Sequence, residues 1–318
     1  MTPSRNPFSG RNSSGYRFKF QVRSISFHTL FLPLEMKDLP CIQQLIQGVS
    51  PLTAFNCLTM ESARTAFCDL RKKYDFDFWA ATEYFIRDVD DADNIIPLRL
   101  NPYQFFVIDI LRKRYFNRQL GRYIITKSLR RCGLTTCIQA YILWMQTFQR
   151  RNNSYTCTAG NLSLCPLKSD LCRYLRRDII PPDMGIYLPK VDWHAFFNTF
   201  RSPDAIRGIN LGYVHFADMS RWRDPDSKKT RRAYSAAVSA VLLEYFTLVV
   251  LEGNIPKEER FSIMKFLHEN PCTDESERKW ILSKSFRNPF FINEVIYSST
   301  HPNSVFLHIN IDYGFPSK

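Results

Sequence analysis

The chain has 318 residues, of which 45% are hydrophobic, and a formal net charge of +13. This composition excludes wholesale disorder and predicts one large or two modest domains. No apolar run has the length of a membrane span, and the polar N-terminus lacks the apolar core of a secretion signal, so we expect a cytoplasmic protein without a membrane partner.

The N-terminal part of the chain is predicted to be mostly helical. Residues 1–16 are polar and form a flexible basic arm, and residues 17–93 form a helical lead-in. Within the lead-in, apolar and aromatic residues recur at helical spacing from Glu61 to Phe85, which predicts helix over that stretch.

Strands alternate with helices from residue 94 to residue 270. A first helix is expected over Tyr103–Tyr115. The strands expected after it are Arg122–Thr126, Ser154–Thr158, Ala195–Phe200, Gly212–Ala217 and Phe246–Leu251. The helices expected between and after them are Thr135–Phe148, one that ends near Arg177, Arg231–Tyr245 and Glu258–His268. This alternation predicts an α/β fold, a mostly parallel sheet with helices on both faces.

The basic charge is concentrated in this part of the chain. From Leu111 to Ser169 there are eleven Lys or Arg residues and no Asp or Glu. Such a stretch favours an anionic partner, with nucleic acid ahead of a membrane surface. The nine Cys residues include no CxxC pair and the six His residues show no ligand spacing, so no zinc site is expected.

A phosphate-binding loop is indicated between the predicted strand Arg122–Thr126 and the helix that follows. Its residues are Ser128, Leu129, Arg130, Arg131, Cys132, Gly133, Leu134, Thr135 and Thr136. In a P-loop, backbone N–H groups at a helix N-terminus surround phosphate, a Lys neutralises it and a hydroxyl holds Mg²⁺. Here Leu134 stands in the Lys position, and the two arginines can supply the charge instead.

The order of motifs around this loop resembles the ATPase domain of phage terminase large subunits, the motors that push DNA into capsids. The segments that carry the likeness are Pro97–Gln104, the loop itself and Ile138–Trp144. The resemblance implies a P-loop NTPase-like fold with ATP and Mg²⁺ as cofactors. It makes Gln104 the adenine contact and Thr135 a metal ligand. The implied phosphate contacts are Arg130, Arg131, Cys132, Gly133, Leu134, Thr135 and Thr136.

The resemblance extends to Tyr213–Trp222, which looks like a Walker B strand. In one alignment Asp218 takes the place of the catalytic Glu, and in the other it is the Mg²⁺ carboxylate. Either alignment leaves one acid of the pair missing. The implied catalytic residues are Asp218 and Arg130, and the implied metal ligands are Thr135 and Asp218.

Three departures from the family pattern bear on turnover: Leu134, the missing acid beside Asp218, and a turn at Leu251–Pro256 that lacks a hydroxyl. Residues 271–318 form a C-terminal extension with one expected strand, Val305–Asp312, a possible start of a truncated nuclease domain. The resemblance implies an ATP hydrolase of the DNA-packaging type. Two alternatives remain: a decayed relative that binds DNA or a packaging component without turnover, and an unrelated basic α/β DNA-binding protein.

The partners implied by the resemblance are double-stranded DNA and a portal or small terminase subunit. A working motor would be a homo-oligomeric ring, in which an arginine of one subunit completes the next subunit's site. If the chain is phage-encoded, its location would be the host cell cytoplasm.

Overall fold

The computed structural model describes residues 32–88, 94–127, 132–158, 161–174, 186–188, 193–199, 209–217, 240–241, 244–254, 280–282, 291–297 and 305–311. By its internal contacts the chain divides into two compact units, Met1–Phe106 and Val107–Lys318. The division expected from the sequence, at residues 16, 93 and 270, stays a prediction. Within the described ranges, every helix is too short or too polar to span a bilayer.

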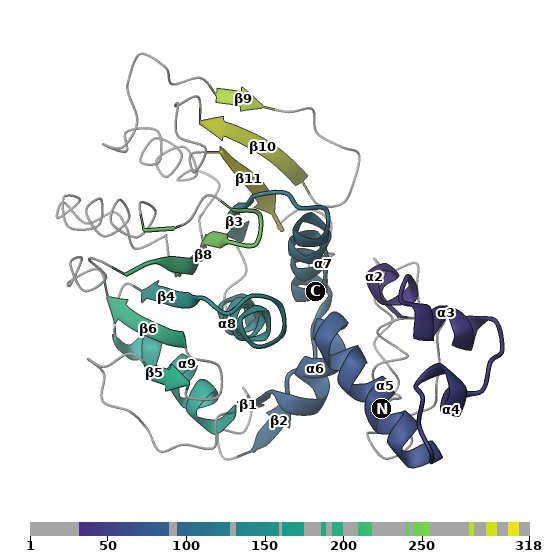
Figure 1. Ribbon diagram of the computed structural model, residues 1–318. Coiled ribbons are helices and arrows are strands. Elements are labelled where there is room, and N and C mark those ends of the chain that lie inside the picture. The colour runs from purple at the N-terminus through teal and green to yellow at the C-terminus, as the bar shows by residue number, and fades with distance from the viewer. Residues whose placement is uncertain are drawn as a thin grey trace, which may run out of the picture. The chain divides into compact units, whose positions relative to one another are not determined.

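The first unit is mainly helical, as the sequence predicts (Figure 1). Its helices are α2 (Leu34–Lys37), α3 (Pro40–Ile46), α4 (Pro51–Ala54), α5 (Met60–Tyr74) and α6 (Phe76–Glu83). Two short strands, β1 (Phe85–Arg87) and β2 (Ile95–Pro97), pair antiparallel after α6. The sequence analysis did not predict this hairpin.

The helix expected over Glu61–Phe85 is broken at Asp75. Asp75 has an extended backbone, ends α5, and accepts a hydrogen bond from the Phe78 backbone N–H at 3.3 Å as the N-cap of α6. The Asp75 carboxylate also pairs with buried Arg71 at 3.0 Å. A capping aspartate therefore divides a continuous helical pattern into two helices.

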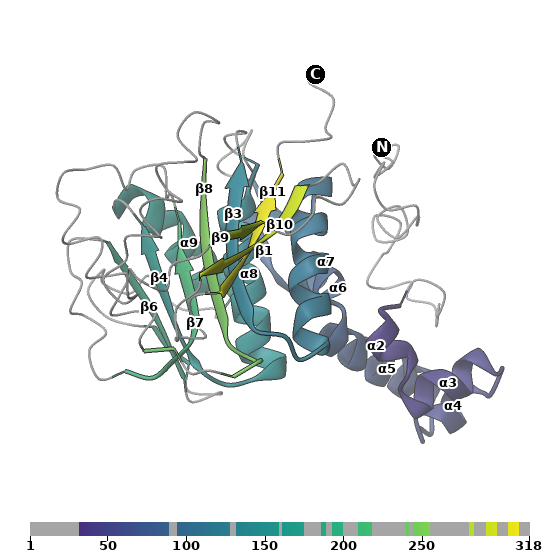
Figure 2. The ribbon, with the colours of Figure 1, turned by 90° about the horizontal axis from the view of Figure 1, so that it is seen from above.

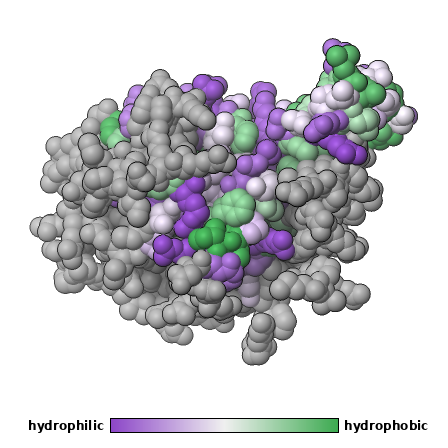
Figure 3. Space-filling view, turned by 90° about the horizontal axis from the view of Figure 1, so that it is seen from below, coloured by the Kyte–Doolittle hydropathy of each residue, from purple (hydrophilic) through white to green (hydrophobic). Residues whose placement is uncertain are grey.

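The core of the first unit forms where the helices converge. Its buried residues are Leu32, Met36, Ile42, Phe67 and Phe78. Several large apolar side chains of this unit are exposed, among them Leu34, Ile46, Leu58 and Met60. On the face drawn in Figure 3, apolar residues lie among hydrophilic ones over the described surface.

The second unit is built on one sheet with the strand order β5-β6-β4-β7-β8-β3-β11-β10-β9. The strands are β3 (Gly121–Lys127), β4 (Asn153–Thr158), β5 (Ile186–Leu188), β6 (Trp193–Thr199), β7 (Leu211–Phe216), β8 (Leu248–Asn254), β9 (Trp280–Leu282), β10 (Phe291–Tyr297) and β11 (Val305–Asn310). Strands β6, β4, β7, β8, β3 and β11 pair in parallel, and β5, β9 and β10 add antiparallel edges. The predicted α/β class with a mostly parallel sheet is confirmed.

Two helices of this unit connect parallel strands. Helix α8 (Leu134–Trp144) joins β3 to β4, and α9 (Asn161–Tyr174) follows β4, with β5 between α9 and the parallel strand β6. Figures 1 and 2 show α8 beside the central strands, and nearly all of its residues are buried. Helix α7 (Pro102–Phe116) precedes β3.

Strand β8 extends further than the sequence predicts. The stretch from Leu251 to Asn254 was expected to be a turn, but it continues the strand because its backbone pairs with β3 as far as Asn254 opposite Lys127. Upstream, the prediction of a helix over Arg231–Tyr245 is wrong at the residues of this stretch that the structure describes, which are 240–241 and 244–245. Val241 forms a parallel bridge with Leu211, and Tyr245 lies in a turn.

The start of β3 is packed tightly against β8. Every residue of β3 is buried, and Arg122 is held by Thr247, whose hydroxyl accepts from Nη2 at 3.1 Å. A Cβ on Gly121 would lie 2.6 Å from the Thr247 carbonyl oxygen. The close approach of the two backbones therefore requires glycine at position 121.

We predict that Gly121→Ala lowers the free energy of unfolding by about 1–3 kcal/mol, because the added methyl forces β3 away from β8. Gln119→Ala, an exposed site two residues earlier, is the matched control and should change little. Urea unfolding curves of the two variants and the wild type measure the difference. Equal stability of Gly121→Ala and wild type would contradict the close approach.

Candidate phosphate-binding site

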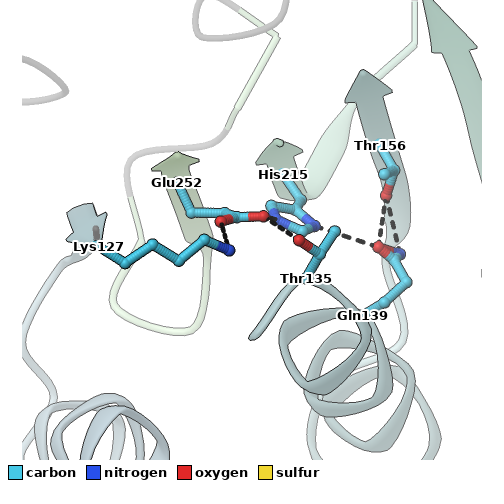
Figure 4. A network of polar contacts seen from close by, with 6 residues as sticks. All are labelled: Lys127, Thr135, Gln139, Thr156, His215 and Glu252. Atoms are coloured by element: carbon cyan, nitrogen blue, oxygen red, sulfur yellow. Dashed lines mark hydrogen bonds and ion pairs between the residues drawn. The ribbon is translucent and has the colours of Figure 1, made fainter. Parts of the chain in front are cut away.

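Six polar side chains come together at the carboxyl ends of the central strands (Figure 4). Parallel strands end at the same edge of a sheet, which is where α/β folds place ligands. Four of the residues are on strands and two are on the first turns of α8. They are Lys127 on β3, Glu252 on β8, His215 on β7, Thr156 on β4, and Thr135 and Gln139 on α8.

Glu252 is the centre of this cluster. Its side chain is fully buried (0% exposed), and Oε2 lies 2.7 Å from the Lys127 ammonium, whose side chain is 10% exposed. The Thr135 hydroxyl donates to Oε1 of the same carboxylate. His215 Nε2 lies 3.8 Å from Oε1. One buried carboxylate thus joins a strand end, a neighbouring strand and the N-terminus of α8.

Lys127 and His215 hold Glu252 in its charged form. Burial by itself would raise the pKa of the carboxyl group, but the Lys127 charge, together with the contacts to His215, outweighs burial and lowers the pKa to about 2. The carboxylate is therefore ionised at neutral pH. Lys127 and Glu252 form a buried pair in which each charge depends on the other.

Behind Glu252, a second set of hydrogen bonds fixes the imidazole of His215. His215 Nδ1 lies 3.3 Å from Gln139 Oε1. Gln139 and Thr156 contact each other at 2.8 Å, with the amide nitrogen donating to the hydroxyl and the hydroxyl donating to the amide oxygen. His215 was expected to be an interior histidine; it is fully buried, but its contacts place it in the polar cluster.

Gly133 precedes the first residue of α8 and has a left-handed backbone. Its φ of 66° and ψ of 15° are left-handed, a region that glycine enters without the steric cost of a side chain. The next residue, Leu134, is fully buried (0% exposed). The side chain of position 134 therefore belongs to the core, where an apolar residue is expected.

The other predicted phosphate contacts divide between described and undescribed residues. Cys132 and Thr136 are half-buried beside Gly133. Arg130 and Arg131 lie outside the described residues, and so does Asp218. The roles proposed for these three residues therefore stay predictions. Ala217, directly before Asp218, is buried, and its N–H donates to the Cys157 carbonyl at 2.9 Å.

Gln104 has a local structural role. Its side-chain oxygen accepts from the Asn101 N–H at 3.0 Å, and the Asn101 side chain accepts from the Gln104 N–H at 2.9 Å. This reciprocal pair is a capping box at the start of α7. Gln104 belongs to the first compact unit, and the adenine contact implied for it stays a prediction.

Two members of the cluster, Lys127 and Glu252, were not singled out from the sequence. Lys127 is the last residue of β3 and comes directly before the loop, so its position was a usable signal. Glu252 is the only charged residue in β8, and a lone acid in a buried strand needs a partner. Its partner Lys127, however, lies on a strand far earlier in the chain, and no local pattern connects the two.

Comparison with solved structures finds chains of similar fold. No protein-family model matches the sequence, and no curated protein matches it. The fold is similar to that of a large terminase from a thermophilic bacteriophage, solved in complex with ADP, with 18% identity and a TM-score of 0.32. The likeness covers 61% of this chain and 64% of that chain, which is less than two thirds of its length.

We predict that Glu252 makes the stability of the fold sensitive to acid. The pKa of about 2 in the folded state lies below the ordinary value of 4.5. The stabilisation is therefore present above about pH 4.5 and is lost as the pH falls towards about 2, a loss of about 3 kcal/mol in total. Urea unfolding from about pH 5 to about pH 3 should show a steeper decline for wild type than for Glu252→Gln. Parallel declines would mean that the carboxylate has an ordinary pKa.

Proposed function

We propose that the loop between β3 and α8 binds the phosphates of a nucleotide, and that Lys127 supplies the positive charge that position 134 lacks. The observation that carries this proposal is the position of the Lys127 ammonium. It is almost buried at the start of the loop and contacts the same carboxylate as Thr135, at the N-terminus of α8. A cation, a hydroxyl and the N–H groups of a helix N-terminus are the donors that phosphate binding uses.

The donor set also fits Mg²⁺, which the proposed nucleotide would bring. The Thr135 hydroxyl at the N-terminus of α8 supplies an oxygen atom, the ligand type that Mg²⁺ prefers, and Asp218 would supply a second. When bound, Mg²⁺ would neutralise charge on the phosphates. Among the described residues no group of three or more His, Cys, Asp or Glu side chains could form a metal cage, so the phosphates would supply ligands as well.

The wider role we propose is that of a terminase-like ATPase that handles double-stranded DNA. Its support is the order of motifs in the sequence and the acid-free basic stretch from Leu111 to Ser169. DNA would bind through its phosphate groups, without sequence-specific contacts to the bases. The affinity for DNA would therefore fall as the salt concentration rises. A portal or small terminase subunit, and a ring of identical subunits, belong to the same proposal.

A second candidate function is nucleotide binding without turnover. The observation that favours it is the cluster itself, because the only described carboxylate in contact with Thr135 is paired with Lys127. A carboxylate held in this way is not available to activate water. The two candidates differ in whether Asp218 supports hydrolysis.

We predict that Lys127→Met weakens ADP binding roughly ten- to hundredfold, because a charge-assisted contact to phosphate is lost. Lys113→Met, which removes an exposed lysine of α7, should leave the affinity unchanged. Isothermal titration calorimetry of both variants, below their unfolding temperatures, measures the effect. Wild-type affinity in Lys127→Met would assign the phosphate charge to another residue.

Hydrolysis distinguishes the two candidate functions. If the chain is an ATPase, we expect Asp218→Asn to reduce ATP turnover in the presence of DNA by a factor on the order of 100 or more, while ADP binding persists. The measurement is the rate of phosphate release from ATP by wild type and Asp218→Asn in the presence of DNA. Binding without turnover in wild type would establish the non-hydrolysing relative.

A further inference from the structure

The proposed phosphate site is occupied by an anion of the chain itself. Lys127 and Thr135 are the two side chains that would hold phosphate, and both contact Glu252 (Figure 4). Oε2 of the carboxylate faces the ammonium and Oε1 faces the hydroxyl. The carboxylate thus makes the pair of contacts that two oxygen atoms of a phosphate group would make.

A ligand phosphate cannot simply join this arrangement. It would place a second anion beside a fully buried carboxylate, where charges are weakly screened. Binding therefore requires Glu252 to leave Lys127 and Thr135.

We propose that Glu252 is an internal competitor of the phosphate ligand, which holds Lys127 and Thr135 until a phosphate group displaces it. This inference rests on the proposed phosphate-binding function and adds the regulation of that site. The state with Glu252 in place binds ligand poorly, and the state with Glu252 released binds it well. The measured affinity is lowered by the fraction of molecules in the first state.

His215 provides a place for the released carboxylate. The Nε2 atom of His215 lies 3.8 Å from Oε1 of Glu252. This nitrogen has no hydrogen bond to any of the residues that the structure describes. The ring itself is held through Nδ1 by Gln139. A short rotation of Glu252 away from Thr135 would bring its carboxylate to the imidazole on β7, which donates to it when Nε2 carries a proton. Phosphate binding at β3 is thereby coupled to β7, the strand that leads to Asp218.

The test compares four proteins: wild type, Glu252→Gln, Lys127→Met and the double variant. Gln keeps the shape of Glu252 and can still accept from Thr135, but it no longer competes for the ammonium. The probes are inorganic pyrophosphate and ADP, titrated by calorimetry, and thermal unfolding without ligand reports stability. Glu244→Gln is the matched control, because it removes an exposed acid just before the opposite end of β8.

We expect Glu252→Gln to bind both probes roughly tenfold more tightly than wild type, although it unfolds at a lower temperature. Lys127→Met should bind both probes roughly ten- to hundredfold more weakly than wild type. The double variant should recover stability relative to the single variants, since no buried charge is left unpaired, but it should not bind. Glu244→Gln should resemble wild type.

Each other outcome has a defined meaning. If wild type binds and folded Glu252→Gln binds equally or more weakly, the internal competitor is refuted and the proposed function stands. If none of the proteins binds either probe, both proposals fail. If Glu252→Gln does not fold, Glu252→Asp takes its place. Its carboxylate is one methylene further from Lys127, so tighter binding supports the proposal and unchanged binding overturns it.

Discussion

The ion pair between Lys127 and Glu252 is the interaction on which the site depends. It joins the end of β3 to β8 inside the protein, where both charges are largely removed from water. Removal of either partner leaves the other charge buried and unpaired. This lowers the free energy of unfolding far more than the loss of an exposed ion pair would. The pair therefore constrains the sheet at the point where the loop to α8 begins.

Around this pair, the parallel topology decides which residues meet. Strand β8 lies between β3 and β7, so a side chain on β8 can reach both neighbours. Glu252 contacts Lys127 on one side and His215 on the other, and α8 brings Thr135 and Gln139 over the same edge. Residues from four strands and one helix thus form a single connected cluster.

This arrangement bears on the proposed phosphate loop. Position 134 is apolar because its side chain enters the core, and Lys127, the cation of the proposed site, is at the start of the loop. The residues after Leu251, which were expected to form a turn, continue strand β8. Glu252 in this part of the strand contacts Thr135 of helix α8. If the proposed phosphate site is correct, its use would depend on how readily the carboxylate is displaced.

Much of the fold could be predicted because its signals are local. Alternating apolar runs and helical periodicity gave β3, β4, β6, β7 and α8 close to their observed bounds, and Gly133 marked the start of the helix. The hairpin β1–β2, the break at Asp75 and the length of β8 depended on capping and pairing partners that a single segment does not reveal.

The sequence by itself determined the α/β class, the strand–loop–helix element and the basic character of the chain, because composition and periodicity are properties of neighbouring residues. Only the tertiary structure decided that Lys127, Glu252 and His215 belong to one site. Their positions in the chain are far apart, and the order of strands in a sheet follows from packing and crossover geometry rather than from local pattern.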